Sequence, residues 1–297
     1  MIKTAVVGYG NVGKEVVEAI LADDEFELVC IVGRSDAKIP NDLKSKFVNS
    51  AEKAKALGVD VAILSLPSRM CPKAAEEYLS LGINTVDGFD IHSKTWETRC
   101  ALEECAKKHS KAAVLAAGWD PGSDSIVRAL MESMAPKGIT YTNFGPGMSM
   151  GHTVAVKAIE GVKAALSMTI PTGTGIHRRM VYIELEDGYT LSQVSAKIKA
   201  DDYFAHDETH VFEVPSVSNL LDMGHGVNLV RKGVSGAAHN QTMDFNMSIN
   251  NPALTGQIMV SCARAVLKQA PGCYTMIELP VINMLKGTTE ELVKRLV

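Results

Sequence analysis

The sequence predicts an α/β protein in which a doubly wound parallel sheet is followed by a second, mixed α+β domain. Its 297 residues are about twice the usual length of one domain. The first ~120 residues alternate β-branched runs with amphipathic helical stretches, a pattern typical of parallel strands joined by crossover helices. Beyond them the strand-like segments are longer and alternate polar with apolar residues, which indicates an antiparallel or mixed sheet.

The strands of the first part are apolar almost throughout, as strands covered on both faces by helices should be. We expect residues 1–120 to form the first domain. Its predicted strands span residues 4–7, 28–32, 59–64, 84–86 and 113–116, and its predicted helices span 12–22, 51–57, 71–80 and 94–109.

The second domain is expected to span residues 121–251 and to begin with a helix over 125–134. Alternating segments at 175–185 and 242–249 predict strands of its sheet. The remaining stretches, 252–268 and 277–297, are predicted to be largely helical. We expect this C-terminal part, 252–297, to pack back on the first domain.

Composition and charge exclude several classes of protein. Hydrophobic residues make up 46% and charged residues 22%, close to the globular average. The net charge is −4 with both signs interspersed, so no basic stripe exists for nucleic acid. The chain opens on a strand-like segment without the basic and apolar regions of a signal peptide. Residues 139–156 are uncharged but too polar for a membrane span. We therefore expect a cytoplasmic protein without nucleic-acid or membrane partners.

Cysteine and histidine residues do not predict a metal site. The six cysteines are scattered, without a Cys-x-x-Cys pair, and are interpreted as reduced thiols. The segment from His206 to His210 resembles a metal cluster but departs from the His-Glu-x-x-His order. We interpret it as an exposed polar loop before a strand at Val211, and we expect no bound metal.

A glycine motif follows the first strand directly and leads into a helix. In that setting it is the dinucleotide-binding fingerprint of a Rossmann-type fold, so we expect residues 1–120 to form a dinucleotide-binding domain. The N-terminus of the helix offers N–H groups to phosphates. A Walker A loop is nearly satisfied because Lys14 follows the last glycine, but Glu15 stands where that loop needs Ser or Thr. The predicted cofactor-binding residues here are Gly8, Tyr9, Gly10, Asn11, Val12 and Gly13.

The residues after the second strand indicate NADP as the cofactor. Arg34 and Ser35 stand where NAD enzymes carry an acidic residue for the ribose, and a guanidinium with a hydroxyl suits a 2′-phosphate. The alternative is that Arg34 is a solvated surface residue and Asp36 contacts the ribose. Three further residues after the third strand are expected to border the cofactor, namely Ser65, Pro67 and Ser68.

Two carboxylates follow the next two strands, where ligands bind in a doubly wound sheet. Asp90 and Asp120 could bind a substrate ammonium and hold the neutral amine that hydride transfer requires. Structural alternatives remain: Asp120 could cap the helix near Pro121, and Asp90 could belong to a plain turn. Arg179 could face solvent beside Arg178.

Three segments together resemble the meso-diaminopimelate dehydrogenase family, and the resemblance covers nearly the whole chain. They are Val86–His92, the Gly-Trp-Asp-Pro-Gly segment 118–122 and the Gly-Pro-Gly segment 145–152. The resemblance implies reversible, NADP-dependent oxidative deamination of meso-2,6-diaminopimelate at its D-centre, giving L-2-amino-6-oxopimelate and ammonia in lysine biosynthesis. It also implies a homodimer whose contacts lie in the 121–251 domain, together with substrate binding.

The resemblance assigns roles to individual residues. Asp90 and Asp120 would be catalytic, and with Trp119 and Phe144 they would surround the D-centre. Phe144 replaces the Trp of many members. The segment between Pro171 and Arg178 is short, as in the compact branch, whose members accept other D-amino acids. Met150 and Gly151 would line the middle of the substrate, and the L-centre would be held by Thr169, Arg179, His225 and Asn251.

Two rival functions differ from this one. Another two-domain NADPH oxidoreductase, such as a dihydrodipicolinate reductase, would not need polar partners at both ends of its pocket. A non-catalytic NADPH sensor would not need Asp90 and Asp120 at the strand ends. A substrate with two amino-acid ends is favoured by Arg179, by Asn251 and by His225, which lies between two glycines.

Overall fold

The computed structural model describes residues 1–35, 39–221 and 224–297. Asp36, the alternative ribose partner, lies outside these residues. The chain divides into two compact units, one formed by Met1–Val127 with Pro252–Val297 and the other by Arg128–Asn251. The C-terminal stretch therefore belongs to the same compact unit as the N-terminal one.

Unit 1 contains a seven-stranded parallel sheet in the order β14-β6-β5-β4-β1-β2-β3. The order reverses between β1 and β4, which is the topology of a Rossmann-type sheet, and the predicted fold class is confirmed. The strands are β1 (Ile2–Val7), β2 (Phe26–Val32), β3 (Phe47–Val48), β4 (Val61–Leu64), β5 (Asn84–Asp87), β6 (Ala112–Val114) and β14 (Gly272–Tyr274).

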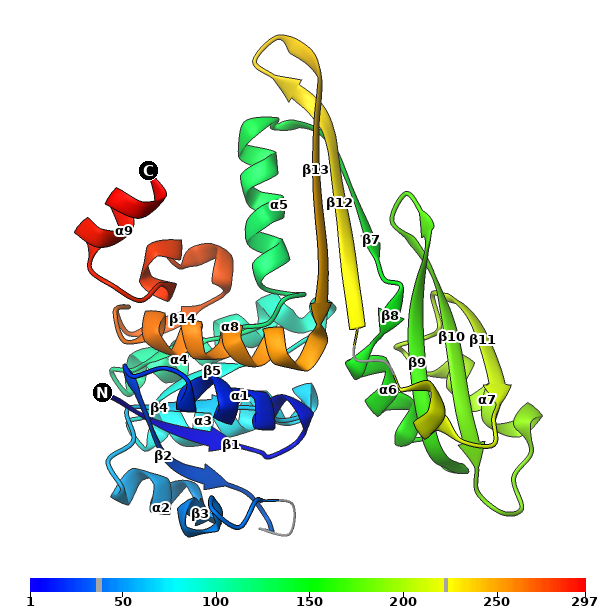
Figure 1. Ribbon diagram of the computed structural model, residues 1–297, viewed down its shortest axis with the longest axis horizontal. Helices are drawn as coiled ribbons and strands as arrows, with labels where there is room; N and C mark the ends of the chain where they lie inside the picture. The colour runs from blue at the N-terminus through cyan, green and yellow to red at the C-terminus, as the bar shows by residue number, and fades with distance from the viewer. Residues whose placement is uncertain (36–38, 222–223) are drawn as a thin grey trace. The chain divides into compact units, whose positions relative to one another are not determined.

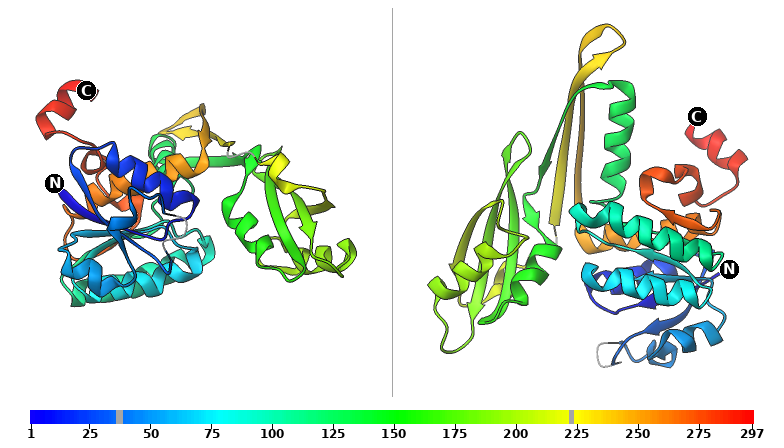
Figure 2. Two further views of the ribbon diagram at one scale, coloured as in Figure 1. Left: turned by 60° about the horizontal axis from the view of Figure 1, so that its bottom comes forward. Right: turned by 180° about the vertical axis from the view of Figure 1, so that it is seen from behind.

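Helices cover both faces of this sheet, α3 and α4 on one face and α1 and α8 on the other (Figures 1 and 2). Ala62 and Leu64 of β4 are fully buried and share one apolar core with Leu79 of α3 and Leu102 of α4. Burial of these side chains on one face of the sheet favours folding. The helices of unit 1 are α1 (Asn11–Leu21), α2 (Ala51–Ala56), α3 (Cys71–Ser80), α4 (Thr95–Lys108), α8 (Asn251–Val266) and α9 (Thr289–Leu296). Helix α5 (Ser123–Met134) contains the boundary between the two units.

Unit 2 contains two sheets, in the orders β11-β10-β9-β8 and β13-β12-β7. The first is mixed, because β10 pairs with β11 in parallel and with β9 antiparallel. The second is antiparallel, so the expectation of a mixed domain is confirmed. The strands are β7 (Lys137–Phe144), β8 (Gly147–Met148), β9 (Val162–Gly173), β10 (Ile176–Leu185), β11 (Glu208–Glu213), β12 (Gly224–Ser235) and β13 (Ala238–Asn250).

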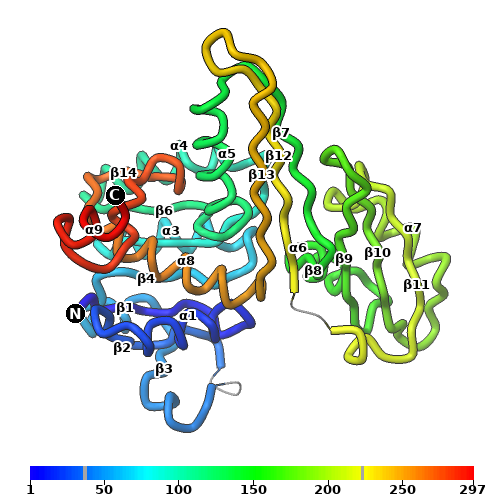
Figure 3. Tube along the Cα trace, turned by 45° about the horizontal axis from the view of Figure 1, so that its top comes forward, coloured from blue at the N-terminus to red at the C-terminus, as the bar shows by residue number. Residues whose placement is uncertain are grey.

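Two helices, α6 (Met150–Lys157) and α7 (Leu191–Ala200), share one apolar core with the four-stranded sheet of unit 2. Val181 and Ile183 of β10 are fully buried in this core with Ile198 of α7 and the nearby Phe204. The other sheet is dominated by the long β12–β13 hairpin (Figure 3). The buried guanidinium of Arg231 in β12 donates two hydrogen bonds to the carbonyl of Ala135.

Residues 277–297, predicted to be largely helical, contain two short 3₁₀ turns, Met276–Glu278 and Val281–Met284, followed by α9. Pro280 between the turns has no N–H for a continuing helix. The segment from His206 to His210 is not entirely a loop, because β11 begins at Glu208. Within the described parts of the chain, no helix is long and apolar enough to cross a membrane.

Candidate functional site

The glycine turn after β1 has the shape that a dinucleotide requires. Gly8 has a φ of 92°, which disfavours other residues. A Cβ on Gly13 would lie 2.1 Å from the Gly8 carbonyl oxygen, whereas no described heavy atom lies within 4 Å of a Cβ built on Gly10. The first turn of α1 carries no acidic residue, and no side chain caps it at Gly10. The N-terminus of α1 therefore fits a diphosphate.

The turn after β2 holds Arg34 and Ser35. Both side chains are exposed, and the N–H of Gly33 donates to the Val48 carbonyl of β3 at 3.1 Å, which fixes the start of the turn. An exposed guanidinium beside a hydroxyl can bind a ribose phosphate. Their assignment to the cofactor stays a prediction.

The loop after β4 contacts both the glycine turn and a predicted catalytic residue. The carbonyl oxygen of Ser65 would lie 2.6 Å from a Cβ on Gly8. Pro67 precedes a 3₁₀ turn, Ser68–Met70. The Ser68 hydroxyl donates to Asp90 Oδ1 at 2.5 Å and accepts the Asp90 N–H at 3.1 Å. Ser68, predicted to border the cofactor, thus fixes the conformation of Asp90.

A fully buried carboxyl group, Asp87, ends β5. Its Oδ1 accepts N–H groups from Phe89 at 3.0 Å and from Ala116 at 3.3 Å. Ala116 has a φ of 60°, a conformation that costs free energy in a non-glycine residue. Asp87 therefore holds the segments that lead to Asp90 and to Asp120. Burial raises the pKa of Asp87 to about 6, although both N–H donors lower it.

Asp87→Asn should make the free energy of unfolding less dependent on pH. A carboxyl group whose pKa is raised on folding stabilises the protein most below its unfolded pKa, and this contribution is lost as pH rises through the folded pKa, about 6. From pH 5 to 7.5, the wild type should lose about 1–2 kcal/mol relative to the variant. Denaturant unfolding of both proteins across this range measures the difference. A constant difference would contradict the raised pKa.

The loop that carries Asp120 is closed by two glycines. Gly122 has a φ of 148°, and a Cβ there would lie 1.8 Å from the Gly118 carbonyl oxygen. Trp119 is buried within this loop. Asp120 Oδ2 lies 4.0 Å from His92 Nε2, and the His92 side chain is mostly exposed. The loop thus presents a carboxylate beside an imidazole, two groups that can accept a proton.

The first N–H groups of α5 bear on whether Asp120 is needed as a cap. The N–H of Ser123 donates to the Gly118 carbonyl and the N–H of Asp124 to the Trp119 carbonyl, both at 3.0 Å. The N–H of Gly122 donates to the Ser125 hydroxyl at 3.2 Å. These three donors therefore have acceptors other than the Asp120 carboxylate.

Unit 2 brings Thr169 and Arg179 together, because they are opposite each other on β9 and β10. Arg179 Nη1 donates to Thr169 Oγ1, and Arg179 Nε donates to Asp207 Oδ2 at 2.6 Å. The Arg179 side chain is 13% exposed, against 42% for Arg178. The two adjacent arginines therefore differ in burial, and Arg179 is the more buried.

His225 and Asn251, both buried, lie near the Gly-Pro-Gly segment of unit 2. A Cβ on Gly147 would lie 2.7 Å from His225 Nδ1, so a glycine is required for this approach. The Asn251 amide donates to the Met148 carbonyl at 3.5 Å, a long hydrogen bond. Both side chains are thus placed against β8.

His152, in the first turn of α6, lies close to Arg179, Asp207 and His225. Its Nδ1 is 2.7 Å from the Ser149 hydroxyl, and its ring meets Tyr203 and Phe204 edge-on. Burial and then the positive charge of Arg179 lower the pKa of His152 to about 3. His152 is therefore neutral at neutral pH and adds no positive charge beside Arg179.

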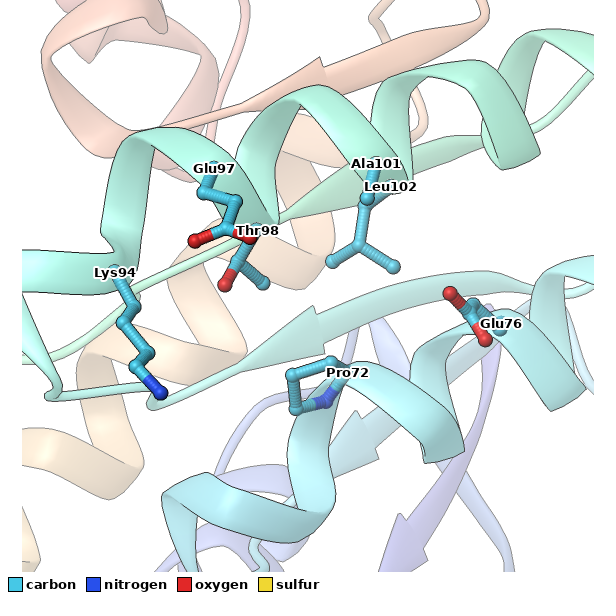
Figure 4. A pocket seen from close by; sticks show the side chains of 7 residues that line it. All are labelled: Pro72, Glu76, Lys94, Glu97, Thr98, Ala101 and Leu102. Atoms are coloured by element: carbon cyan, nitrogen blue, oxygen red, sulfur yellow. The ribbon is translucent and has the colours of Figure 1, made fainter.

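The other predicted substrate residues of unit 2 lie along one segment. The N–H of Phe144 donates to His177 Nε2 at 2.8 Å, and the two rings are 5.3 Å apart. Met150 and Gly151 are the first residues of α6, and both are partly exposed. Among described residues, a shallow pocket also lies between α3 and α4, lined by Glu76, Lys94 and Glu97 among others (Figure 4). It contains no predicted site residue.

Sequence reasoning missed His92, His152, His177 and Asp207. Each contacts a predicted residue or lies near one, but the partners of His177 and Asp207 are 33 and 28 positions away in the chain. No spacing rule connects such pairs. His152 was within a motif that had been noticed, and its place three residues after Ser149 was the available signal.

A parallel sheet with a nucleotide turn after β1, and with carboxylates beyond β5 and β6, defines a nicotinamide-dependent oxidoreductase. Residues 118–178 match the family model of the diaminopimelic acid dehydrogenase C-terminal domain. The chain is 60% identical over 296 residues to the meso-diaminopimelate D-dehydrogenase of Bacteroides fragilis, covering 100% of this chain and 99% of that protein. The chain belongs to the meso-diaminopimelate D-dehydrogenase family.

Solved structures agree with this assignment. The DAP dehydrogenase of C. glutamicum in complex with DAP is 26% identical, with a TM-score of 0.90 over 100% of this chain and 99% of that one. An engineered D-amino acid dehydrogenase bound to NADP⁺ is 25% identical, also with a TM-score of 0.90 and the same coverage of both chains. The expected family is thereby confirmed.

Proposed function

We propose that this protein oxidises meso-2,6-diaminopimelate at its D-centre, reversibly, to L-2-amino-6-oxopimelate and ammonia, with NADP⁺ as the oxidant. The observation that carries the proposal is the 60% identity to a meso-diaminopimelate D-dehydrogenase over essentially all of both chains. The carboxylates beyond β5 and β6 support it, since a dehydrogenase of amino acids must bind and deprotonate an ammonium group. We further propose that it acts as a cytoplasmic homodimer.

The chemistry assigns tasks to the residues of unit 1. The D-centre loses its C–H electron pair as hydride, which the nicotinamide accepts when bound, and water then replaces nitrogen at that carbon. Asp90 and Asp120 attract the ammonium group and accept its proton, so that the neutral amine can donate its lone pair as hydride leaves. Ser68 keeps the Asp90 carboxylate in one orientation. Trp119, buried beside Asp120, shapes the pocket around the D-centre.

Residues of unit 2 recognise the rest of the substrate in this proposal. Phe144, Met150 and Gly151 contact the D-centre and the carbon chain. Arg179, held by Thr169, binds the carboxylate of the L-centre. His225 and Asn251 complete the binding site for that centre. Binding energy from this remote end orients the reacting end.

The function is tested by mixing the protein with meso-diaminopimelate and NADP⁺ and following the absorbance of the reduced nicotinamide. Turnover of the meso isomer is expected, with the LL isomer inert because it has no D-centre. The DD isomer tests recognition of the L-centre and should react poorly. No reduction with any isomer or D-amino acid would contradict the proposal and favour an NADPH sensor.

Arg34→Asp should weaken NADP⁺ binding far more than NAD⁺ binding. The exposed guanidinium follows β2, and the proposal assigns it to the 2′-phosphate, which NAD⁺ lacks. Losing a charged hydrogen bond costs about 1.5–3 kcal/mol, which is roughly tenfold or more in Kd, and the new carboxylate adds repulsion. Fluorescence titration with both reduced cofactors measures the ratio. Equal losses would show that Arg34 does not contact the 2′-phosphate.

A further inference from the structure

Asp207, the residue just before β11, is in contact with the guanidinium of Arg179. We propose that Asp207 is a positioning residue for substrate specificity: it holds the Nε edge of Arg179, so that the Nη groups face the carboxylate of the substrate's L-centre. This inference rests on the proposed function. It assigns a functional role to one residue of the His206–His210 segment, a segment that the proposed function does not otherwise use.

The strand geometry separates Arg179 from its neighbour. Successive side chains of a strand point to opposite faces of the sheet, so Arg179 shares a face with the buried Val181 and Ile183. Its partner Asp207 is 27% exposed, whereas Arg178 pairs with Glu208, which is 53% exposed, on the other face. Two adjacent ion pairs thus differ in burial, and only one involves the predicted carboxylate-binding arginine.

The hydrogen bonds of the guanidinium define which of its groups remain for a ligand. Arginine has five N–H donors in a planar fork. Asp207 accepts the Nε–H at 2.6 Å, and Thr169 accepts one hydrogen of Nη1. The remaining donors are all on Nη1 and Nη2, and among the described residues no protein acceptor is in contact with them. Two parallel N–H groups at this end match a carboxylate.

The charges around Arg179 make Asp207 the only anionic residue in contact with it among the described residues. His152 is neutral because burial and Arg179 lower its pKa, and Thr169 carries no charge. A partly buried cation needs a counter-charge, so a simpler role for Asp207 would be neutralisation. Neutralisation requires the charge alone, whereas positioning also requires the length of the aspartate side chain.

The test compares Asp207→Asn with Glu208→Gln, which removes the same charge from the adjacent ion pair. Asp207→Asn should lower kcat/KM for meso-diaminopimelate about tenfold or more, chiefly through a higher KM. Glu208→Gln should stay within about twofold, as expected for an exposed pair. Similar values for both variants would overturn the proposal. Absence of turnover by the wild type would instead overturn the proposed function.

Two further variants separate positioning from neutralisation and from folding. Asp207→Glu keeps the charge and lengthens the side chain by one methylene, so it should fold normally, by circular dichroism and thermal melting, yet still raise KM several-fold. Wild-type kinetics of Asp207→Glu would show that Asp207 only neutralises the charge of Arg179 and does not position it. In an Arg179→Met background, Asp207→Asn should cause no further loss of kcat/KM. An equal loss in both backgrounds would show that Asp207 does not act through Arg179.

Discussion

Asp120→Asn is expected to lose at least about 100-fold in the rate of oxidative deamination while keeping its fold. The amide preserves the shape of the carboxylate but cannot attract an ammonium group or accept its proton. Three N–H groups at the start of α5 have other acceptors, so the melting temperature should change little. The measurement is kcat for NADPH formation with saturating meso-diaminopimelate.

The reverse reaction provides an internal control for Asp120→Asn. The overall equilibrium constant cannot change, so kcat/KM for reductive amination of the oxo acid must fall together with kcat/KM for oxidation. A variant with wild-type kcat and an unchanged melting temperature would show that the charge of Asp120 is not needed for catalysis. A large loss of melting temperature would instead place its contribution in the Gly118–Gly122 loop.

Arg179→Met should impair meso-diaminopimelate far more than D-alanine, which has no distal carboxylate. Losing a charged hydrogen-bond partner costs on the order of 1.5–3 kcal/mol for the long substrate. The binding energy of the remote end also orients the reacting end, and the short substrate lacks this energy in either protein. The measurement is the ratio of kcat/KM values for the two substrates in wild type and variant.

Two outcomes of the Arg179→Met experiment would contradict the assignment. Equal losses for both substrates in a folded variant would show that Arg179 either contacts the D-centre or has a structural role. No loss for either substrate would show that Arg179 does not bind the substrate. Arg178→Met is a matched control on the same strand, because its side chain points to the opposite face.

The parallel sheet of unit 1 was predictable because its strands are buried on both faces and its helices separate them regularly. The predicted helix 71–80 has the bounds of α3, and β4 and β5 were found to within two residues. Two strands were missed, β3 and β14, which have two and three residues. Such short runs show no measurable periodicity.

The second unit was less predictable. Its hairpin strands were found only in part, since β13 is exposed or half-exposed along its whole length and offers a weak contrast between faces. Helix α7 has a detectable start, because Thr190 and Gln193 form a capping box. Helix α6 was missed because Gly151 is its second residue and a glycine-rich segment precedes it, which favours a loop over a helix.

The candidate site also has a part that could be predicted from the sequence and a part that could not. Residues that follow strands, such as Asp90 and Asp120, could be predicted because the fold places strand ends at the ligand. Their supporting contacts could not be. Ser68 contacts Asp90, 22 positions away, and Asp207 contacts Arg179, 28 positions away. These pairs depend on the tertiary fold, which local patterns do not encode.

The close packing of Gly8, Gly13 and Ser65 has a consequence for how this enzyme can evolve. A single added carbon at position 8 or 13 would collide with backbone at 2.6 or 2.1 Å, so neither glycine can be replaced one mutation at a time without moving the adjacent loop. Arg34 and Ser35, in contrast, are exposed and can be exchanged singly. In the proposed function Arg34 and Ser35 bind the 2′-phosphate, so selection could shift the preference between NADP⁺ and NAD⁺ in small steps while the glycine turn stays unchanged.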